Sequence, residues 1–286
     1  MISLKYIKAG TKKWWRKLKK KAIRSYRIAT SRWRKLPDII IIGTQKGGTT
    51  SLFAYLLQHP NVMMPWLKEP HFFNTHFDKG LKWYRRFFPL KNSHKIGGEV
   101  TPCYMYHPQV PERMAAVLPN VKLIVMLRNP IDRAYSGYIM GRDYGWDSAE
   151  TFEAALEQES HYKQEINNLH TNLYDNVKFA RIHDQLLYLE RSKYYSQLNV
   201  WFKYFKREQC LFIKSEKFFE NPQEELSKIY DFLKIDRIYP TDLRPRNARQ
   251  YDLLSSKIRA ELEIYFQEEN EKLIELIGEE FNYTAH

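Results

Sequence analysis

The chain of 286 residues has few of the features that define several common protein classes. It contains only two cysteines, Cys103 and Cys210, which are too few for a disulfide framework and lack the spacing of a metal site. We therefore expect a reducing compartment, with one bridge between the two as the alternative. In residues 1–36, no apolar run approaches the roughly 20 residues of a membrane-spanning helix or forms a secretory signal.

Acidic residues are absent from residues 1–36, although this N-terminal segment carries 14 Lys and Arg. It leaves 32 of the 46 basic residues for the remaining chain, against 33 acidic ones. The formal net charge of +13 therefore belongs to the N-terminal segment, and we expect no nucleic-acid partner. We predict a basic amphipathic segment over residues 1–36 and one domain over residues 37–286.

Apolar residues of the N-terminal segment fall near helical spacing among its lysines and arginines. This pattern is typical of a helix that lies on an anionic membrane surface, anchored by tryptophans. The alternative is a solvated basic helix, or an arm that packs on its own domain or on a partner. We expect a cytoplasmic protein, peripheral to a membrane if the first interpretation holds. The apolar positions are Ile7, Trp14, Leu18, Ala22, Ala29, Trp33 and Leu36.

The strongest pattern in the chain is DIIIIGTQKGGTTSLFAYLL, residues 38–57. Its four consecutive isoleucines predict a strand buried on both faces, as in a parallel sheet. The glycines that follow allow a tight turn into a helix predicted over Thr49–Leu57. Unpaired N–H groups at the helix start, together with Lys46, would hold a phosphate or a similar oxyanion. A turn whose glycines serve only packing is the alternative.

Two features of a P-loop kinase are missing. Thr49 stands where a Walker A loop has its lysine, and the lysine of this turn is Lys46. The strand predicted over Val121–Leu127 ends at Arg128, where an acidic Walker B residue would help to hold Mg²⁺. These absences indicate a nucleotide held by cations and backbone groups, without a metal. Arg128 would lie at the carboxyl edge of the sheet, where open α/β sheets bind ligands.

Two candidate proton acceptors, Glu69 and His71, occur in KEPHFFN, residues 68–74. We expect this loop to lie beside the glycine-rich turn. Glu69 is the candidate general base, and an ion pair with Lys68 or Lys46 is its structural alternative. His71 is a second catalytic candidate, with a core histidine as its alternative.

Four motifs together resemble the sulfotransferases of the heparan-sulfate type, whose donor is 3′-phosphoadenosine 5′-phosphosulfate (PAPS). GTQKGGTTSL is similar to the 5′-phosphosulfate loop of that family, and KEPHFFN to its catalytic segment. GEVTPCY is similar to its E-x-[ST]-P-x-Y stretch, and LRNPIDRAYSGY to its 3′-phosphate motif. The resemblance covers most of residues 38–283, and the two phosphate motifs occur in the order found in the family.

The resemblance implies an α/β fold, a P-loop-like three-layer domain with a central parallel sheet flanked by helices. It implies sulfuryl transfer from PAPS to a hydroxyl or amine of a carbohydrate-like acceptor, with 3′-phosphoadenosine 5′-phosphate (PAP) as product and no metal. Lys46 would stabilise the leaving phosphate, Glu69 would take the acceptor proton, and His71 is a further catalytic candidate. The residues implied to bind the donor are Lys46, Gly47, Gly48, Thr49, Thr50, Ser51, Arg128, Ser136, Arg246 and Arg249.

The chain departs from the family pattern at two places. Val100 stands where a lysine usually follows the glutamate of E-x-[ST]-P, and the cysteine pair near the C-terminus is missing. With no membrane anchor expected either, the chain resembles a smaller, bacterial-like member. Two alternatives stay open: a nucleotide-dependent kinase that uses the same loop, and a nucleotide-binding protein of a membrane surface without turnover.

Further elements follow from apolar patterns and helix boundaries. We expect aromatic residues 83–88 to line an acceptor cleft, and residues 143–174 to form a flap over it. Tyr194 and Ser196 resemble positions near the nucleotide. We predict extended segments over Val62–Trp66, Ile96–Val100 and Cys210–Lys214, and helices over Pro111–Leu118, Thr151–Glu159, Lys193–Phe205, Gln223–Leu233 and Leu253–Ile277, with another that begins at Pro130.

Overall fold

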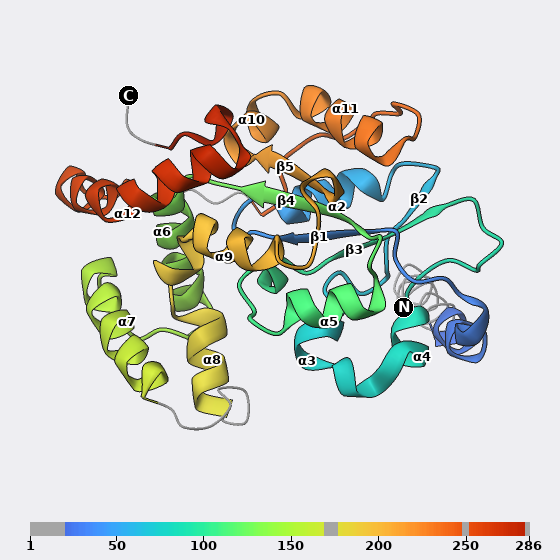
Figure 1. The fold of residues 1–286 in the computed structure, drawn as a ribbon, viewed down its shortest axis with the longest axis horizontal. Coiled ribbons are helices and arrows are strands. Elements are labelled where there is room, and N and C mark those ends of the chain that lie inside the picture. Colours follow the sequence, from blue (N-terminus) through green and yellow to red (C-terminus); the bar gives the residue numbers. More distant parts are fainter. Residues whose placement is uncertain (1–20, 169–176, 248–251, 284–286) are drawn as a thin grey trace, which may run out of the picture.

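A parallel sheet forms the centre of the molecule, and the computed structural model describes residues 21–168, 177–247 and 252–283 (Figure 1). Within these residues the sheet has five strands in the order β2-β3-β1-β4-β5, and every neighbouring pair is parallel. The predicted α/β class with a central parallel sheet is confirmed. The strands are β1 (Ile39–Gly43), β2 (Val62–Met63), β3 (Ile96–Val100), β4 (Lys122–Leu127) and β5 (Cys210–Lys214).

The isoleucine run explains why β1 occupies the middle of the sheet. Ile39 and Ile41 belong to the hydrophobic cluster on one face, and Ile40 and Ile42 to the cluster on the other. All four are at most 1% exposed. A strand covered on both faces needs such a continuous apolar run, because alternate side chains enter different cores. Since all the strands are parallel, their carboxyl ends meet at one edge.

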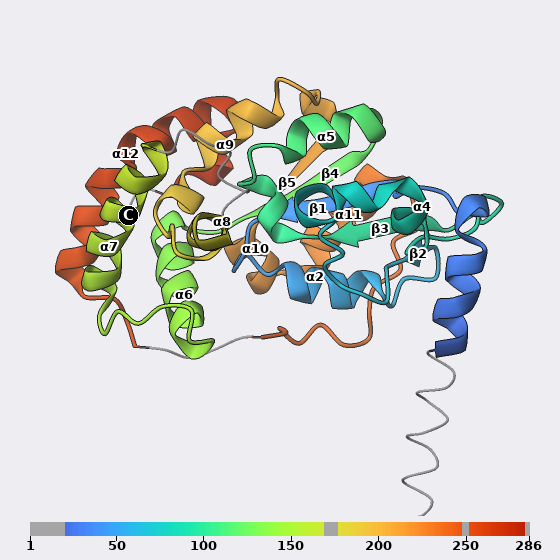
Figure 2. The same cartoon turned by 90° about the horizontal axis from the view of Figure 1, so that it is seen from below.

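Helices cover both faces of the sheet, which gives the predicted three layers (Figure 2). On the face that carries Ile41 lie α2 (Thr49–Leu56), α10 (Ser215–Glu220) and α11 (Pro222–Leu233). On the face that carries Ile40 lie α3 (Phe72–Thr75), α4 (Gly80–Arg85), α5 (Val110–Val117), α9 (Tyr194–Trp201) and α12 (Ser256–Ile277). Short 3-10 helices occupy Ser31–Trp33, Phe77–Lys79, Pro102–Met105, Glu190–Ser192, Arg207–Gln209 and Glu279–Phe281.

A helical lobe lies beyond the carboxyl ends of the strands, on the left in Figure 1. It consists of α6 (Pro130–Asp143), α7 (Phe152–Asn167) and α8 (Val177–Gln185). Tyr138, Phe152 and Leu187 form its separate hydrophobic cluster together with Phe266 of α12. The lobe therefore stands at the edge of the sheet where a ligand of an open α/β fold is expected.

Several predicted boundaries differ from the structure. The helix predicted to stop at Glu159 continues to Asn167, because its polar residues face solvent and the apolar pattern therefore fades before the helix ends. The predicted second extended segment pairs only over Val62–Met63. The short helices α4 and α10, and α8, were not predicted. Cys103 and Cys210 are both free thiols, so the alternative of a bridge is not realised.

The aromatic residues 83–88 were wrongly predicted to line an acceptor cleft. Tyr84, Phe87 and Phe88 are fully buried. The hydroxyl of Tyr84 donates to the buried carboxylate of Glu99, and its ring stacks on Phe72 with centroids 4.1 Å apart. These aromatic residues belong to the core beneath α3 and α4, because their large apolar area is removed from water there.

The end of the N-terminal segment packs on its own domain. Residues 21–29 are helical, Arg27 donates to the carbonyl of Phe87 at 3.1 Å, and Arg34 donates to that of Phe88 at 2.8 Å. The side chains of Ile23, Tyr26 and Trp33 nevertheless remain 43–55% exposed. No helix among the described residues is long and apolar enough to cross a membrane. Ile7, Trp14 and Leu18 lie outside the described residues.

Candidate active site

A glycine-rich turn joins the carboxyl end of β1 to α2, as predicted. Gly48 is the N-cap of α2 and has φ of +92°. A Cβ atom at Gly48 would stand 2.8 Å from the ring of Phe219, and one at Gly47 would stand 3.0 Å from the carbonyl oxygen of Met126. Both positions therefore require glycine, which lets the backbone N–H groups at the start of α2 face the space beyond the sheet.

Three hydrogen bonds from distant segments hold this turn. The guanidinium of Arg128 donates to the carbonyl of Lys46 at 3.4 Å, and the hydroxyl of Ser215 donates to the carbonyl of Gly47 at 2.7 Å. The backbone N–H of Arg246 donates to the hydroxyl of Ser51 at 2.9 Å. These bonds tie the turn to three other segments of the domain and stabilise its conformation.

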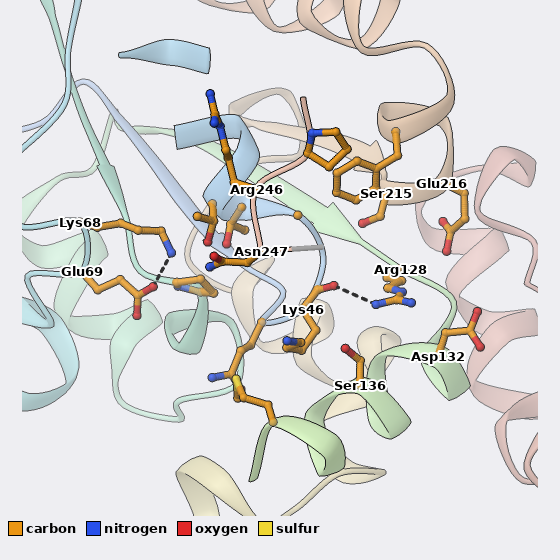
Figure 3. A pocket seen from close by; sticks show the side chains of 18 of the residues that line it. Lys46, Lys68, Glu69, Arg128, Asp132, Ser136, Ser215, Glu216, Arg246 and Asn247 are labelled. Carbon is orange, nitrogen blue, oxygen red and sulfur yellow. Dashed lines mark hydrogen bonds and ion pairs between the residues drawn. The ribbon is translucent and has the colours of Figure 1, made fainter. Parts of the chain in front are cut away.

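A cavity of about 700 Å³ opens at the carboxyl edge of the sheet beside this turn (Figure 3). Its wall brings together most of the predicted site residues from four separate segments. Those that line it are Lys46, Gly48, Thr49, Thr50, Glu69, Arg128, Ser136 and Arg246.

The remaining predicted residues lie elsewhere. Gly47 and Ser51 stand behind the wall and serve the turn through the hydrogen bonds described above. His71 does not line the cavity, although it contacts Glu69. Arg249 lies outside the described residues.

Arg128 and Ser136 are positioned by the start of α6. The side chain of Asn129 caps this helix by accepting from the N–H groups of Ile131 and Asp132 at 3.0 and 3.3 Å, and Pro130 occupies its first turn. The hydroxyl of Tyr194 donates to the carbonyl of Arg128 at 2.9 Å. Arg128 is therefore fixed next to the glycine-rich turn, with Ser136 almost two turns along α6.

Tyr194 and Ser196 both resemble positions near the nucleotide, but only Tyr194 contacts a residue of the cavity wall. The prediction for Ser196 is wrong, because its hydroxyl donates to Glu269 of α12. It lines a separate cavity of about 300 Å³. Tyr194 and Ser196 are two residues apart on α9, and a helix turns about 200° over that interval, so they face different neighbours.

Arg246 lines the cavity from the segment that follows α11. Its guanidinium forms an ion pair of 2.6 Å with Asp242, which also binds Arg244 at 2.8 Å. Hydrogen bonds from Arg244 hold the pKa of Asp242 well below its ordinary value, with Arg246 contributing further. Asp242 is therefore ionised at neutral pH, and it shares the charge of Arg246 with any anion in the cavity.

Glu69 faces the cavity from the loop after β2. Its carboxylate binds Lys68 at 2.7 Å and lies 3.5 Å from Nε2 of His71. Burial raises the pKa of Glu69, but the hydrogen bond from His71 and the charge of Lys68 outweigh it, so the pKa falls below its ordinary value. Glu69 is therefore ionised and able to accept a proton at neutral pH.

His71 stands behind Glu69 and has an αL backbone, with φ of +52°. Its Nδ1 lies 3.5 Å from the sulfur of Cys103 and 3.4 Å from Nδ2 of Asn74. Burial lowers the pKa of His71, but the neighbouring Cys103 and Glu69 raise it to about 10. At neutral pH the imidazole is therefore a cation that donates to Glu69, and in that state it has no site for a further proton.

Glu99, the glutamate of GEVTPCY, has a structural role. Glu99 is fully buried and accepts hydrogen bonds from Tyr84 and, at 2.8 Å, from the hydroxyl of Thr101. These bonds fix the end of β3, after which Pro102 enters the cavity wall. Burial raises the pKa of Glu99 above its ordinary value.

Sequence reasoning missed several residues of the cavity wall. Tyr144 and Trp146 follow the end of α6, and Ser215, Glu216 and Phe219 lie in α10, so none of these five belongs to a phosphate or acid-base motif. One signal was available for some of them, because Met140 and Tyr144 continue the four-residue spacing that begins at Ser136. The missed residues include Lys68, Asp132, Met140, Tyr144, Trp146, Ser215, Glu216 and Phe219.

Comparison with known proteins identifies relatives of most of the chain. A model of the family described as Sulfotransferase domain matches residues 36–260. The chain is 29% identical to the Membrane-associated sulfotransferase kil1 of Dictyostelium discoideum, over 87% of this chain and 66% of that protein. It is 34% identical to the Heparan sulfate glucosamine 3-O-sulfotransferase 3B1 of Homo sapiens, over 72% of this chain and 48% of that protein.

A solved sulfotransferase from Alicyclobacillus acidocaldarius superposes with a TM-score of 0.67 and 26% identity, over 85% of this chain and 96% of that one. The chain spans about half to two thirds of the length of the two curated relatives. These matches confirm the resemblance and the P-loop-like fold predicted from the four motifs.

Proposed function

The chain belongs to the sulfotransferase domain family, and from this premise we propose that it transfers a sulfuryl group from PAPS to a hydroxyl or amine of a carbohydrate-like acceptor. The observation that carries the proposal is that Lys46, Arg128 and Glu69 line one cavity. A donor with one phosphate on the 3′ oxygen and another on the 5′ oxygen of its ribose needs two separate cationic anchors, and the transfer needs a base between donor and acceptor. Relatives named for a heparan sulfate glucosamine support a carbohydrate acceptor.

In this proposal each residue of the cavity has a defined task. The turn of Lys46 to Thr50 holds the 5′-phosphosulfate through backbone N–H and hydroxyl groups, and Arg128 and Ser136 hold the 3′-phosphate. Glu69 takes the acceptor proton as the acceptor oxygen forms its bond to sulfur. The bond from sulfur to the bridging phosphate oxygen breaks, its electron pair stays on that oxygen, and PAP leaves. Lys46 stabilises the charge that grows there.

The matched family favours this reaction over the two alternatives, a kinase and a nucleotide-binding protein without turnover. We propose a reaction that needs no metal ion, since the cations of the wall supply the positive charge. Chelation of Mg²⁺ tests this point. Undiminished sulfate transfer in excess chelator is the expected result, and a complete loss that added Mg²⁺ restores would favour kinase-like chemistry.

Transfer of ³⁵S-labelled sulfate from PAPS to a panel of carbohydrate, lipid and small hydroxyl acceptors tests the function. We expect transfer by the wild type, and a loss of about 10²–10⁴-fold in Glu69→Gln, because the amide cannot take the proton. Glu275→Gln, on the exposed face of α12, is the matched control and should keep full activity. Binding of PAP by calorimetry should survive in Glu69→Gln. Full activity of Glu69→Gln together with a loss in His71→Ala would move the base to the histidine.

We further propose that residues 1–36 form a basic segment that attaches the domain of residues 37–286 to an anionic membrane surface. Its 14 cations without an acid, the exposure of Tyr26 and Trp33, and the name of the Dictyostelium relative support this. Co-sedimentation with phosphatidylserine vesicles, compared with neutral vesicles, tests it. The full chain should bind only the anionic vesicles, and equal binding by a chain without residues 1–36 would contradict the proposal.

A further inference from the structure

The cavity has two aromatic surfaces, and they belong to different segments. Phe219 of α10 packs against the glycine-rich turn, because a Cβ at Gly48 would stand only 2.8 Å from its ring. Its ring is 40% exposed beside the proposed phosphosulfate site. Tyr144 and Trp146 follow the end of α6, and their rings stack with centroids 4.9 Å apart and an interplanar angle of 24°. Phe219 is therefore placed to cover the donor nucleotide, and the stacked pair is a separate surface.

The wall continues from the proposed donor site to this pair. Ser136 and Met140 lie on α6, and Tyr144 is its C-cap residue. The three are four residues apart, so they lie on one face at a rise of about 6 Å per step. The pair thus stands about two steps beyond Ser136, the residue proposed to hold the 3′-phosphate. Tyr144 is 59% exposed, so its ring is available to a ligand.

The backbone holds the aromatic pair in place. The N–H of Tyr144 donates to the carbonyl of Met140 at 3.1 Å, and the N–H of Trp146 donates to that of Gly141 at 2.8 Å. The next residue, Asp147, accepts from the hydroxyl of Tyr188 at 2.6 Å. These bonds hold the backbone that carries the two rings, so less conformational entropy is lost when a flat ligand stacks on them.

The charges on the described part of the wall do not favour a polyanionic acceptor. Lys46 and Arg128 are assigned to the donor, Lys68 is paired with Glu69, and Arg246 is paired with Asp242. Three carboxylates, those of Glu69, Asp132 and Glu216, line the same cavity, and of these Asp132 is paired with Arg259 at 2.6 Å.

Two arginines lie close to the aromatic pair without lining the cavity. Arg142 donates to the carbonyl of Glu150 at 2.7 Å, and Arg181 donates to that of Trp146 at 3.2 Å. A sulfated polysaccharide needs several cations along its path, and the described wall offers few beyond those of the donor site.

We propose that Tyr144 and Trp146 are the acceptor subsite and that they select an uncharged sugar ring over a polyanionic polysaccharide. The apolar C–H face of a neutral pyranose stacks on the aromatic rings, while its rim hydroxyls remain free to approach Glu69. This inference rests on the proposed function, because it assumes that the same cavity carries out sulfuryl transfer. The proposed preference for a neutral sugar differs from the acceptor in the names of the heparan sulfate relatives.

The test compares sulfation of neutral cello-oligosaccharides with sulfation of heparan sulfate, using labelled PAPS and the full chain. We expect kcat/KM to be at least about tenfold higher for the neutral acceptor. In Tyr144→Ala and Trp146→Ala the acceptor KM should rise about three- to tenfold, with the donor KM unchanged. Trp146→Phe should recover most of the loss. Tyr204→Ala, at an exposed tyrosine outside the cavity, is the control and should match the wild type.

Different failures have different meanings. A preference for heparan sulfate would overturn this inference and leave the proposed function intact. A rise of the donor KM in place of the acceptor KM would assign the aromatic pair to the nucleotide and also overturn it. Binding of PAP without sulfation of any neutral sugar would again count against the inference alone. No binding of PAP by the wild type would instead overturn the proposed function.

Discussion

The two walls of the cavity are built in different ways. The donor wall, as we call the residues proposed to bind PAPS, consists of the glycine-rich turn, Arg128 and Arg246. The turn and Arg128 follow directly from the adjacent central strands β1 and β4. The acceptor wall, as we call the residues proposed to face the acceptor, consists of Glu69 in one loop and Tyr144 and Trp146 in another. In the proposed function, the sheet would fix where the phosphates bind, and the loops would decide what receives the sulfuryl group.

Among changes to the donor wall, removal of the cation of Lys46 should have the largest effect. In Lys46→Ala we expect kcat to fall about 10²–10³-fold, because charge on the leaving phosphate oxygen loses its stabilisation. The thermal midpoint should change little, and the acceptor KM should stay near that of the wild type. Lys82→Ala, at an exposed lysine of α4, is the control. A rise in the acceptor KM with unchanged kcat would place Lys46 on the acceptor wall and break the comparison.

The pH profile should report the base of the acceptor wall. Because the pKa of Glu69 lies below its ordinary value of 4.5, kcat/KM should be flat from about pH 6 to about pH 9 and fall tenfold per unit only below the lowered pKa. The pKa of His71 is about 10. The imidazole therefore loses its positive charge near that pH, and we expect a second change of kcat/KM there. A histidine base with that pKa would give a different curve, in which kcat/KM rises tenfold per unit up to about pH 10.

A substitution at Gly48 in the donor wall should affect both the stability of the protein and the binding of PAP. Gly48→Ala places a methyl group against Phe219 at a residue with φ of +92°, so we expect a loss of about 1–3 kcal/mol in the free energy of unfolding and weaker PAP binding. Gly80→Ala is the control for backbone strain without a clash, since Gly80 has φ of +70° and ψ of 169°, a region essentially restricted to glycine, and a Cβ atom there would meet no heavy atom within 4 Å.

Gly80→Ala should lose about 1–3 kcal/mol through backbone strain alone and keep its PAP affinity. Denaturant unfolding and calorimetry measure the two quantities. An equal loss of PAP affinity in the two variants would show that Gly48 has no local role in PAP binding.

The smallest effect is expected for Arg246, which is paired with Asp242. Arg246→Ala should raise the donor KM about two- to fivefold, because Asp242 already neutralises part of its charge. Arg244→Ala removes the other partner of Asp242, and its side chain is 81% exposed, so it serves as the control with no direct role. Steady-state kinetics at varied PAPS gives both values. A larger change in Arg244→Ala than in Arg246→Ala would remove Arg246 from the donor wall.

The donor wall was more accessible to sequence reasoning than the acceptor wall, for physical reasons. Buried parallel strands have continuous apolar runs, and the turn after such a run lies at the ligand edge by topology, so Lys46 and Arg128 could be placed in advance. Tyr144 and Trp146 follow a helix end with no motif, and their position depends on how the helical lobe packs. The wrong prediction for Tyr84 has the same cause, because this residue is buried against Glu99 of a separate strand. Packing of distant segments is not encoded in local periodicity.

The three hydrogen bonds on the glycine-rich turn come from residues 82, 168 and 195 positions away in the sequence. The conformation of this turn therefore depends on the assembly of β1, β4, the start of α10 and the segment around Arg246. A nucleotide that binds this turn draws on the folding free energy of most of the chain. Donor binding should accordingly protect the segment around Arg246, which is distant in the sequence, from proteolysis, and the intact turn should be among the last parts of the native structure to form.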